Sequence, residues 1–182
     1  YHYNSGGDPT DIPDLTYEQF KAFYDVHYHP SNAIFITFGD IPATEHQAQF
    51  EDNALSRFDR LDCHIEVNNE RRYDHPQYVE EAYAFDEPEG TENQSHIVLS
   101  WLLGDATDLE ATMCARLLSS VLLDNSGSPL QQALETTDLG TSPSPMCGLE
   151  DSQKELIFAC GVEGSNPENA DAVEALILSV LQ

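Results

Sequence analysis

The stretch from residue 3 to residue 41 constrains the fold most, because it marks the start and the end of a helix and then specifies a strand. Thr16 and Gln19 have the spacing of a capping box, which fixes a helix N-terminus. Aromatic residues follow at helical spacing as far as Pro30, which cannot continue a helix. Residues 33–38 then form a nearly continuous apolar run, which predicts a short buried strand. The chain must therefore combine helices with strands.

A second helix is predicted over residues 44–58. Thr44 and Gln47 have capping-box spacing, and apolar residues recur every four positions as far as Phe58. Beyond it the chain becomes polar and irregular. We interpret residues 63–77 as a linker between a first part, residues 1–62, and a second part, residues 78–182.

The second part is predicted to contain strands at residues 79–85 and 96–103, joined by a turn, and a further strand at residues 155–162. Strands and helices occur in separate groups along it. This order indicates an α+β fold, with layered helices on a mostly antiparallel sheet, rather than alternating parallel units.

Three helices are predicted in the second part. The first begins with a Thr107/Glu110 capping box, and we expect its buried side to carry Leu109, Met113, Leu117 and Val121. The second begins at Ser128-Pro129, an N-cap followed by a proline, and ends near Leu139-Gly140. The last is capped by Asn166-Pro167 and carries an apolar face over residues 170–181.

The chain is strongly acidic, with 33 acidic residues, 7 basic residues and a formal net charge of −26. Such a surface repels phosphate backbones, which argues against nucleic-acid binding. A solvated acidic surface explains the charge better than the attraction of cationic peptides. No apolar run reaches the roughly 20 residues of a membrane span, so no membrane partner is predicted.

The four cysteines show no CxxC spacing, and we expect all of them to be reduced and structural, in a reducing compartment. They are Cys63, Cys114, Cys147 and Cys160. We place Cys114 in a helix core and Cys160 in an apolar strand.

No catalytic, cofactor-binding or metal-binding residue is predicted. Neither HExxH nor HxxEH occurs, and the one close pair of histidines, His27 and His29, is separated by roughly 200° on a helix. The Ser126-Gly127-Ser128 segment reads as a turn before a helix cap rather than as a nucleophile. Gly6-Gly7 lacks the context of a phosphate loop.

Several motifs, in order, resemble the insulinase-type zinc metallopeptidases with an inverted HxxEH site, in the presequence-protease branch. They are SGGDP at 5–9, IPDLTYEQF at 12–20, YHPSN at 28–32, FGD at 38–40 and SSVLLDNSGSPLQQALETTDLG at 119–140. The resemblance implies parts of two homologous insulinase-like domains: the end of a catalytic-type domain, and the opening of a second one. It also implies a zinc-dependent parent that degrades peptides in a closed chamber, with the zinc ligands upstream of Tyr1.

By the same resemblance, the helix with the sequence DLEATMCARLLSSVLL at 108–123 would correspond to the metal-bearing helix of the first domain, but it contains no histidine. We therefore expect this segment to enclose substrate without catalysing its cleavage. The expected partners are peptide substrates and the remaining domains of the same chain, and the expected location is the bacterial cytoplasm or an organelle matrix. The alternative is a scaffold or binding subunit of an inactive insulinase-like protein.

Neither end of the chain reads as natural, which predicts a fragment. We also expect that a truncated apolar face over residues 170–181 could drive dimerisation.

Overall fold

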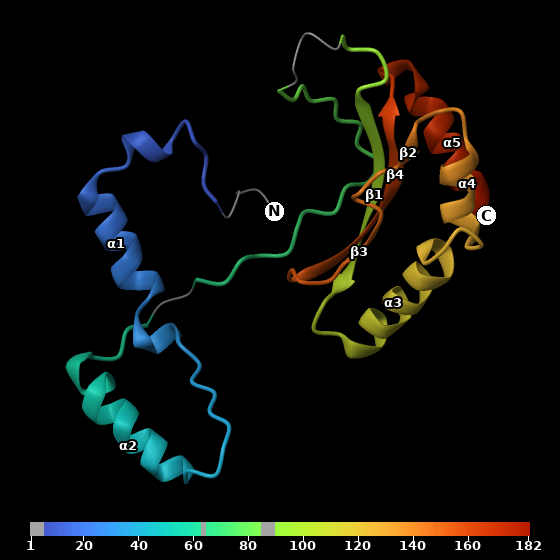
Figure 1. The fold of residues 1–182 in the computed structure, drawn as a ribbon. Helices are drawn as coiled ribbons and strands as arrows, with labels where there is room; N and C mark the ends of the chain where they lie inside the picture. The colour runs from blue at the N-terminus through green and yellow to red at the C-terminus, as the bar shows by residue number, and fades with distance from the viewer. Residues whose placement is uncertain (1–5, 63–64, 85–89) are drawn as a thin grey trace. The chain divides into compact units, whose positions relative to one another are not determined.

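The computed structural model describes residues 6–62, 65–84 and 90–182, and the chain divides into two compact units (Figure 1). Unit 1 comprises Tyr1–Asn68 and unit 2 comprises Asn69–Gln182. The division falls inside the predicted linker.

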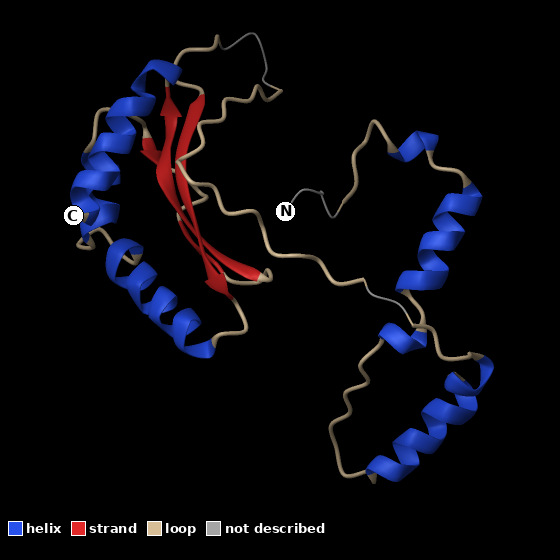
Figure 2. Cartoon of the chain, turned by 180° about the vertical axis from the view of Figure 1, so that it is seen from behind, coloured by secondary structure: helices blue, strands red, loops and turns tan. Residues whose placement is uncertain are grey.

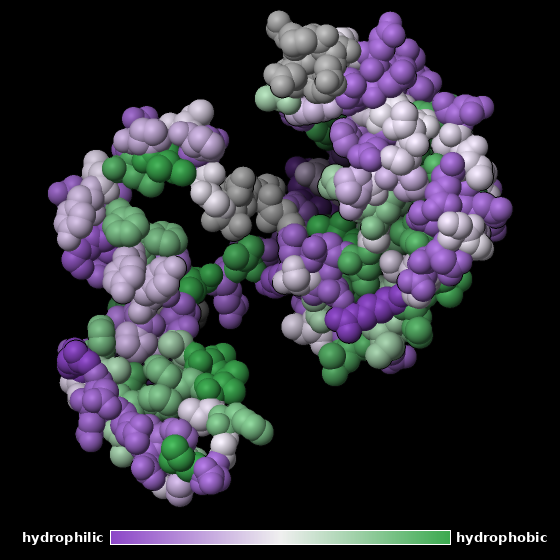
Figure 3. Space-filling view, viewed as in Figure 1, coloured by the Kyte–Doolittle hydropathy of each residue, from purple (hydrophilic) through white to green (hydrophobic). Residues whose placement is uncertain are grey.

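The described part of unit 1 contains two α-helices and three short 3-10 turns. The helices are α1 (Tyr17–His27) and α2 (Ala43–Asn53), and the turns are Ile12–Asp14, Pro30–Asn32 and Leu55–Arg57. The predicted capping box at α1 is confirmed: Gln19 N donates to Thr16 Oγ1 at 3.2 Å, and Thr16 N donates to Gln19 Oε1 at 2.9 Å. None of the described residues of unit 1 is buried, and Figure 3 shows hydrophobic residues (green) on its surface.

Two predictions in unit 1 are wrong. Residues 33–38 are not a strand, although the ring of Phe35 packs against that of Phe50 with the centroids 4.7 Å apart. A strand needs a neighbouring strand to pair with, and the described part of unit 1 contains none. Helix α2 begins after Pro42, so Thr44 lies inside it and makes no cap, and the helix ends at Asn53 because the backbone of Ala54 leaves helical geometry.

Unit 2 is built around an antiparallel sheet whose central strand is β4 (Glu155–Ser165). The long strand β1 (Ser95–Asp105) pairs with one edge of β4, and the short strands β2 (Ser142–Pro143) and β3 (Gly148–Glu150) pair with the other edge. The predicted strands at 96–103 and 155–162 are confirmed and extended. The whole arrangement confirms an α+β fold with an antiparallel sheet.

Helices α3 (Leu109–Leu123), α4 (Pro129–Thr136) and α5 (Ala170–Leu181) line one face of this sheet (Figure 2). The core lies between the sheet, α4 and α5. Its buried members are Leu130, Leu134, Phe158, Cys160, Val162, Val173 and Ile177. Because Val173 and Ile177 of α5 are buried inside unit 2, the apolar face predicted over residues 170–181 is largely covered there.

The predicted strand at 79–85 is wrong for residues 79–84, which are irregular, and Phe85 lies outside the described residues. The segment nevertheless lies near β1. Arg72 Nη2 donates to Leu103 O at 3.0 Å near one end of the strand, and the Tyr83 hydroxyl donates to Gln94 O at the other end. Residues 72–83 therefore run antiparallel to β1 without forming a regular ladder with it.

The predicted orientation of α3 is also wrong. Leu109, Met113, Leu117 and Val121 are exposed, and so is Cys114, for which the sequence predicts a place in a helix core. The side of α3 that faces the unit carries mainly small residues together with leucines at its C-terminal end. The small residues allow close approach to the sheet, and the helix is apolar on two sides, so its periodicity could not show which side is buried.

The ends of the unit 2 helices differ from prediction in detail. At α3 the cap is Asp108, whose Oδ1 accepts from Glu110 N at 3.1 Å and Ala111 N at 3.0 Å, whereas Thr107 bonds to Asp105. Helix α4 follows Ser128-Pro129 as predicted but ends at Thr136. Asn166-Pro167 begins a 3-10 turn, Pro167–Asn169, that leads into α5. No helix among the described residues is long and apolar enough to cross a membrane.

Candidate functional site

Two neighbouring histidines, His27 at the end of α1 and His29 just beyond it, make separate local contacts. His27 Nδ1 lies 2.9 Å from Phe23 O, and its ring stacks on that of Phe23 with the centroids 3.7 Å apart. His29 Nδ1 accepts from Ser31 N at 3.1 Å, and its ring meets the edge of Phe58. Each ring is held by its own neighbours rather than aimed at a common point.

The other weak candidates from the sequence lie in turns. Ser128 is buried at the start of α4, and its backbone N–H donates to Asn125 O at 2.8 Å. After Gly7, Asp8 Oδ1 accepts from both Thr10 N at 2.8 Å and Thr10 Oγ1 at 2.6 Å, which lowers the pKa of the Asp8 carboxyl. A carboxylate at this position opposes the binding of a phosphate.

The residues that the structure describes do not fit a zinc site. They contain no group of three or more histidine, cysteine, aspartate or glutamate side chains able to hold a metal ion, whereas a zinc enzyme needs three converging protein ligands. His2, Cys63 and His64 lie outside the described residues. The buried thiol of Cys160 has its pKa raised to about 12 by burial, and burial also raises the pKa of Cys147.

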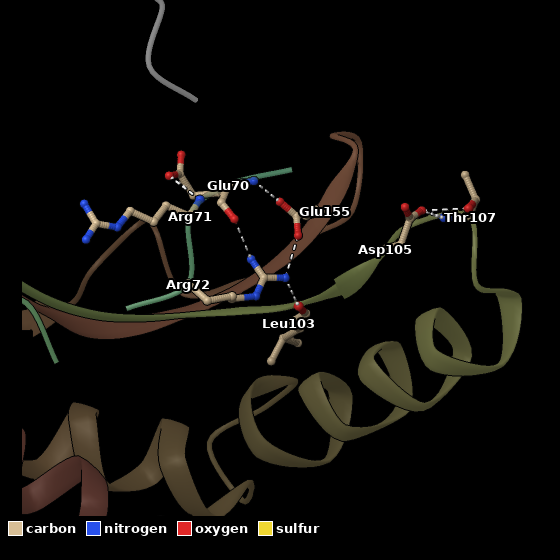
Figure 4. Close-up of polar contacts among 7 residues, drawn as sticks. All are labelled: Glu70, Arg71, Arg72, Leu103, Asp105, Thr107 and Glu155. Carbon is tan, nitrogen blue, oxygen red and sulfur yellow. Dashed lines mark hydrogen bonds and ion pairs between the residues drawn. The ribbon is translucent and has the colours of Figure 1, made fainter. Parts of the chain in front are cut away.

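The strongest polar cluster joins the start of β4 to residues 70–72 (Figure 4). The Glu155 side chain is completely buried, and Glu155 Oε2 accepts from Glu70 N at 2.6 Å. Its other oxygen, Oε1, lies 2.5 Å from Arg72 Nη2, which also donates to Leu103 O on β1. Arg72 itself is about half exposed. One guanidinium thus connects the polar segment to both long strands.

The bonding explains the ionisation of Glu155. The N–H of Glu70 lowers the pKa of the Glu155 carboxyl most; burial raises it, and the bond and charge of Arg72 lower it further. The net effect is a pKa below the ordinary glutamate range, because bonds to the charged form outweigh desolvation. A buried carboxylate with both oxygens occupied is poorly suited to general-base catalysis. The cluster is suited to fixing residues 70–72 on the sheet.

Sequence analysis missed this cluster because its partners are 83–85 residues apart. A weak signal existed in Glu155, a charged residue at the head of an apolar strand, and in Arg71-Arg72, which hold two of the seven basic residues of the chain.

A pocket of about 340 Å³ lies between α3 and β3. The lining residues are Arg116, Ser119, Ser120, Leu123, Asp124, Cys147, Gly148, Leu149 and Asp151. Arg116 Nε lies 2.6 Å from Asp151 Oδ2 within this lining, so both charges are already paired. None of the described lining residues is a histidine, and a thiol with a raised pKa is a weak nucleophile. The pocket therefore lacks a nucleophile paired with a base.

Comparison with known proteins assigns the chain to a family. Residues 14–182 match the family described as "Peptidase M16 inactive domain". The mitochondrial presequence protease of Xenopus tropicalis is 38% identical over 178 residues, which are 97% of this chain and 17% of that protein. The proteins of the same name from Danio rerio and Emericella nidulans are 34% and 40% identical, over 100% and 98% of this chain and 18% and 17% of their own lengths.

The chain thus spans about one sixth of the length of the curated relatives that it matches. The matched region includes most of unit 1 and all of unit 2. The chain belongs to the insulinase-like M16 peptidases, in the presequence-protease branch.

Proposed function

We propose that this chain is a non-catalytic part of a zinc-dependent metalloendopeptidase that degrades peptides inside a closed chamber. The observation that carries the proposal is the match of residues 14–182 to the inactive M16 domain, together with 34–40% identity to presequence proteases over nearly the whole chain. Peptides are then the substrates of the longer protein, and its other domains are the partners of this segment.

The placement of polar groups supports a non-catalytic role. Helix α3, which by resemblance would correspond to the metal-bearing helix, carries no histidine, and the described residues contain no cluster of metal ligands. The buried Glu155 has both oxygens bonded within the fold, which suits scaffolding rather than proton transfer. In this proposal the zinc is held entirely by residues outside this chain.

The domain assignment is part of the same proposal. Residues 1–62 form the end of a first, catalytic-type domain, residues 63–77 form a linker, and residues 78–182 form the opening of a homologous second domain. The division into two units between Asn68 and Asn69 supports a boundary within that linker. Within the linker, residues 70–72 are held to the sheet by Glu155, so its second half belongs to unit 2.

A mitochondrial matrix location is favoured over the bacterial cytoplasm because the relatives are named mitochondrial. The described cysteines, Cys114, Cys147 and Cys160, are all free thiols, which suits a reducing compartment.

The second candidate is a scaffold or binding subunit of an insulinase-like protein without metal. The absence of histidine from α3 is compatible with this candidate as well, and a parent whose first domain had lost its metal ligands would be inactive. The two candidates differ in the activity of the longer polypeptide, not in the fold of this segment.

A fluorogenic-peptide assay on the full-length polypeptide tests the proposal. We expect cleavage that a chelator such as 1,10-phenanthroline abolishes and that added zinc restores, while the separately purified 182-residue chain gives no cleavage. Loss of all cleavage by the folded full-length polypeptide in the presence of zinc would favour the scaffold candidate. Cleavage by the 182-residue chain itself would contradict both.

A further inference from the structure

Helix α3 carries an unpartnered apolar stripe on its outer side. Leu109, Met113, Leu117 and Val121, which we call the α3 stripe, follow one another at intervals of four residues, and each is 56–82% exposed. Figure 3 shows hydrophobic residues (green) along the edge of unit 2 where α3 lies in Figure 1. The opposite side of the helix is already in use, since Leu122 and Leu123 pack against the core. The stripe is thus available to a further partner.

We propose that the α3 stripe is a docking surface for a second α-helix, one with its own apolar ridge and basic flanks, supplied by another part of the same longer polypeptide. The inference rests on the proposed function only in assuming that such a longer polypeptide exists. Beyond the proposed function, the inference specifies which surface of this chain makes the contact and the chemistry of the helix that binds there.

The spacing of the stripe favours a helix as the partner. Residues four apart form a continuous ridge, and ridges of this kind pack into the grooves of another helix. From Leu109 to Val121 the ridge is about 18 Å long, at 1.5 Å per residue, which corresponds to about three helical turns on a partner. Exposed apolar ridges of this length are uncommon on isolated soluble domains and mark interaction sites.

The charge around the stripe argues against a second copy of this chain. Asp108, Glu110 and Asp124 lie on or beside α3, and its one basic residue, Arg116, is paired with Asp151 at 2.6 Å. Each copy carries a formal net charge of −26, so two copies brought into contact repel one another. A partner with lysines or arginines beside its apolar ridge would instead complement these carboxylates.

The length of the relatives favours a partner within the same polypeptide. The chain corresponds to 17–18% of the presequence proteases that it matches, so more than four fifths of each relative lies outside the matched region. A helix from that remainder is present at high effective concentration, because it is linked covalently to the stripe.

Site-specific photo-crosslinking of the full-length polypeptide tests this inference. The photoreactive residue p-benzoylphenylalanine replaces Leu117, and in a matched control it replaces Gln132, which is exposed on α4. We expect irradiation of the Leu117 variant to give a cross-link within one polypeptide, at the monomer mass. Peptide mapping should place it on a helical segment outside residues 1–182 that contains lysine or arginine. The Gln132 variant should give no link to that segment.

Two results would overturn the inference: a cross-linked dimer, or no link from position 117 beyond that of the control. The cross-linking result and the peptidase activity test the docking surface and the proposed function independently. A cross-link within a polypeptide that lacks peptidase activity would retain the docking surface and reject the enzyme. An active, zinc-dependent polypeptide without the cross-link would retain the enzyme and reject the docking surface.

Discussion

Two leucine-to-alanine substitutions in unit 2 test the packing of its helices directly. Leu130 on α4 is 0% exposed and belongs to the core, whereas Leu117 on α3 is 61% exposed, although the sequence predicted it to be buried. Removing a fully buried leucine side chain costs about 2–5 kcal/mol, because transfer and cavity terms add. Full burial of a leucine is worth about 1.5–3 kcal/mol, so the buried two fifths of Leu117 is worth about 1 kcal/mol. The higher helix propensity of alanine offsets a few tenths of that.

Thermal unfolding and urea unfolding of the 182-residue chain measure the effect of both substitutions, the first through the Tm and the second through the m-value. For a unit of this size, 1 kcal/mol corresponds to about 4 °C in Tm, so Leu130→Ala should lower the Tm by about 8–20 °C and Leu117→Ala by less than about 4 °C. The m-value should not change in either variant. Equal losses from the two substitutions would refute the orientation of α3 and remove the basis of the docking surface.

Further substitutions test the sheet, the cap and the buried carboxylate. Gly161→Ala would place a Cβ 2.0 Å from a backbone oxygen of β1 and should cost about 1–3 kcal/mol in urea unfolding, while Gly104→Ala, with no atom within 4 Å, should not. Asp108→Ala should cost about 1 kcal/mol by the same assay, whereas Thr107→Ala should change stability by less than about 0.5 kcal/mol, and the reverse order would contradict the observed cap. Glu155 has a lowered pKa in the folded state, so its contribution is complete above the ordinary glutamate pKa of about 4.3 and is lost as the pH falls below it. Glu155→Gln should therefore flatten the acid limb of a stability–pH profile measured by thermal unfolding, and an unchanged limb would count against the buried pair.

Local signals in the sequence predicted the structure well where neighbouring residues decide it. The capping box of Thr16 and Gln19 and the Ser128-Pro129 helix start need only residues a few positions apart, and both mark real helix starts. The apolar run at 155–162 became the central strand because it can bury both of its faces.

Predictions failed where a distant partner decides the outcome. Residues 33–38 have the composition of a strand, but pairing requires a neighbour that the described part of unit 1 does not supply. Helix α3 is apolar on two sides, so the choice of the buried side depends on the shape of the sheet beneath it rather than on its own periodicity. The contact between Arg72 and Glu155 joins residues 83 positions apart, beyond the reach of any local pattern.

The family resemblance indicated the family of this chain better than any single residue did. Motifs such as IPDLTYEQF pointed to the peptidase family that the comparisons then identified, while the histidines taken alone predicted nothing specific. Identity to presequence proteases extends over both units, including α3, which contains no histidine.

Zinc stoichiometry, measured by inductively coupled plasma mass spectrometry, tests most directly the claim that this segment encloses substrate without holding the catalytic metal. We predict one zinc ion per full-length polypeptide after gel filtration. We predict no retained zinc in the separately purified 182-residue chain at any pH at which histidine side chains are neutral and able to bind a metal. One zinc ion held per 182-residue chain would contradict the account.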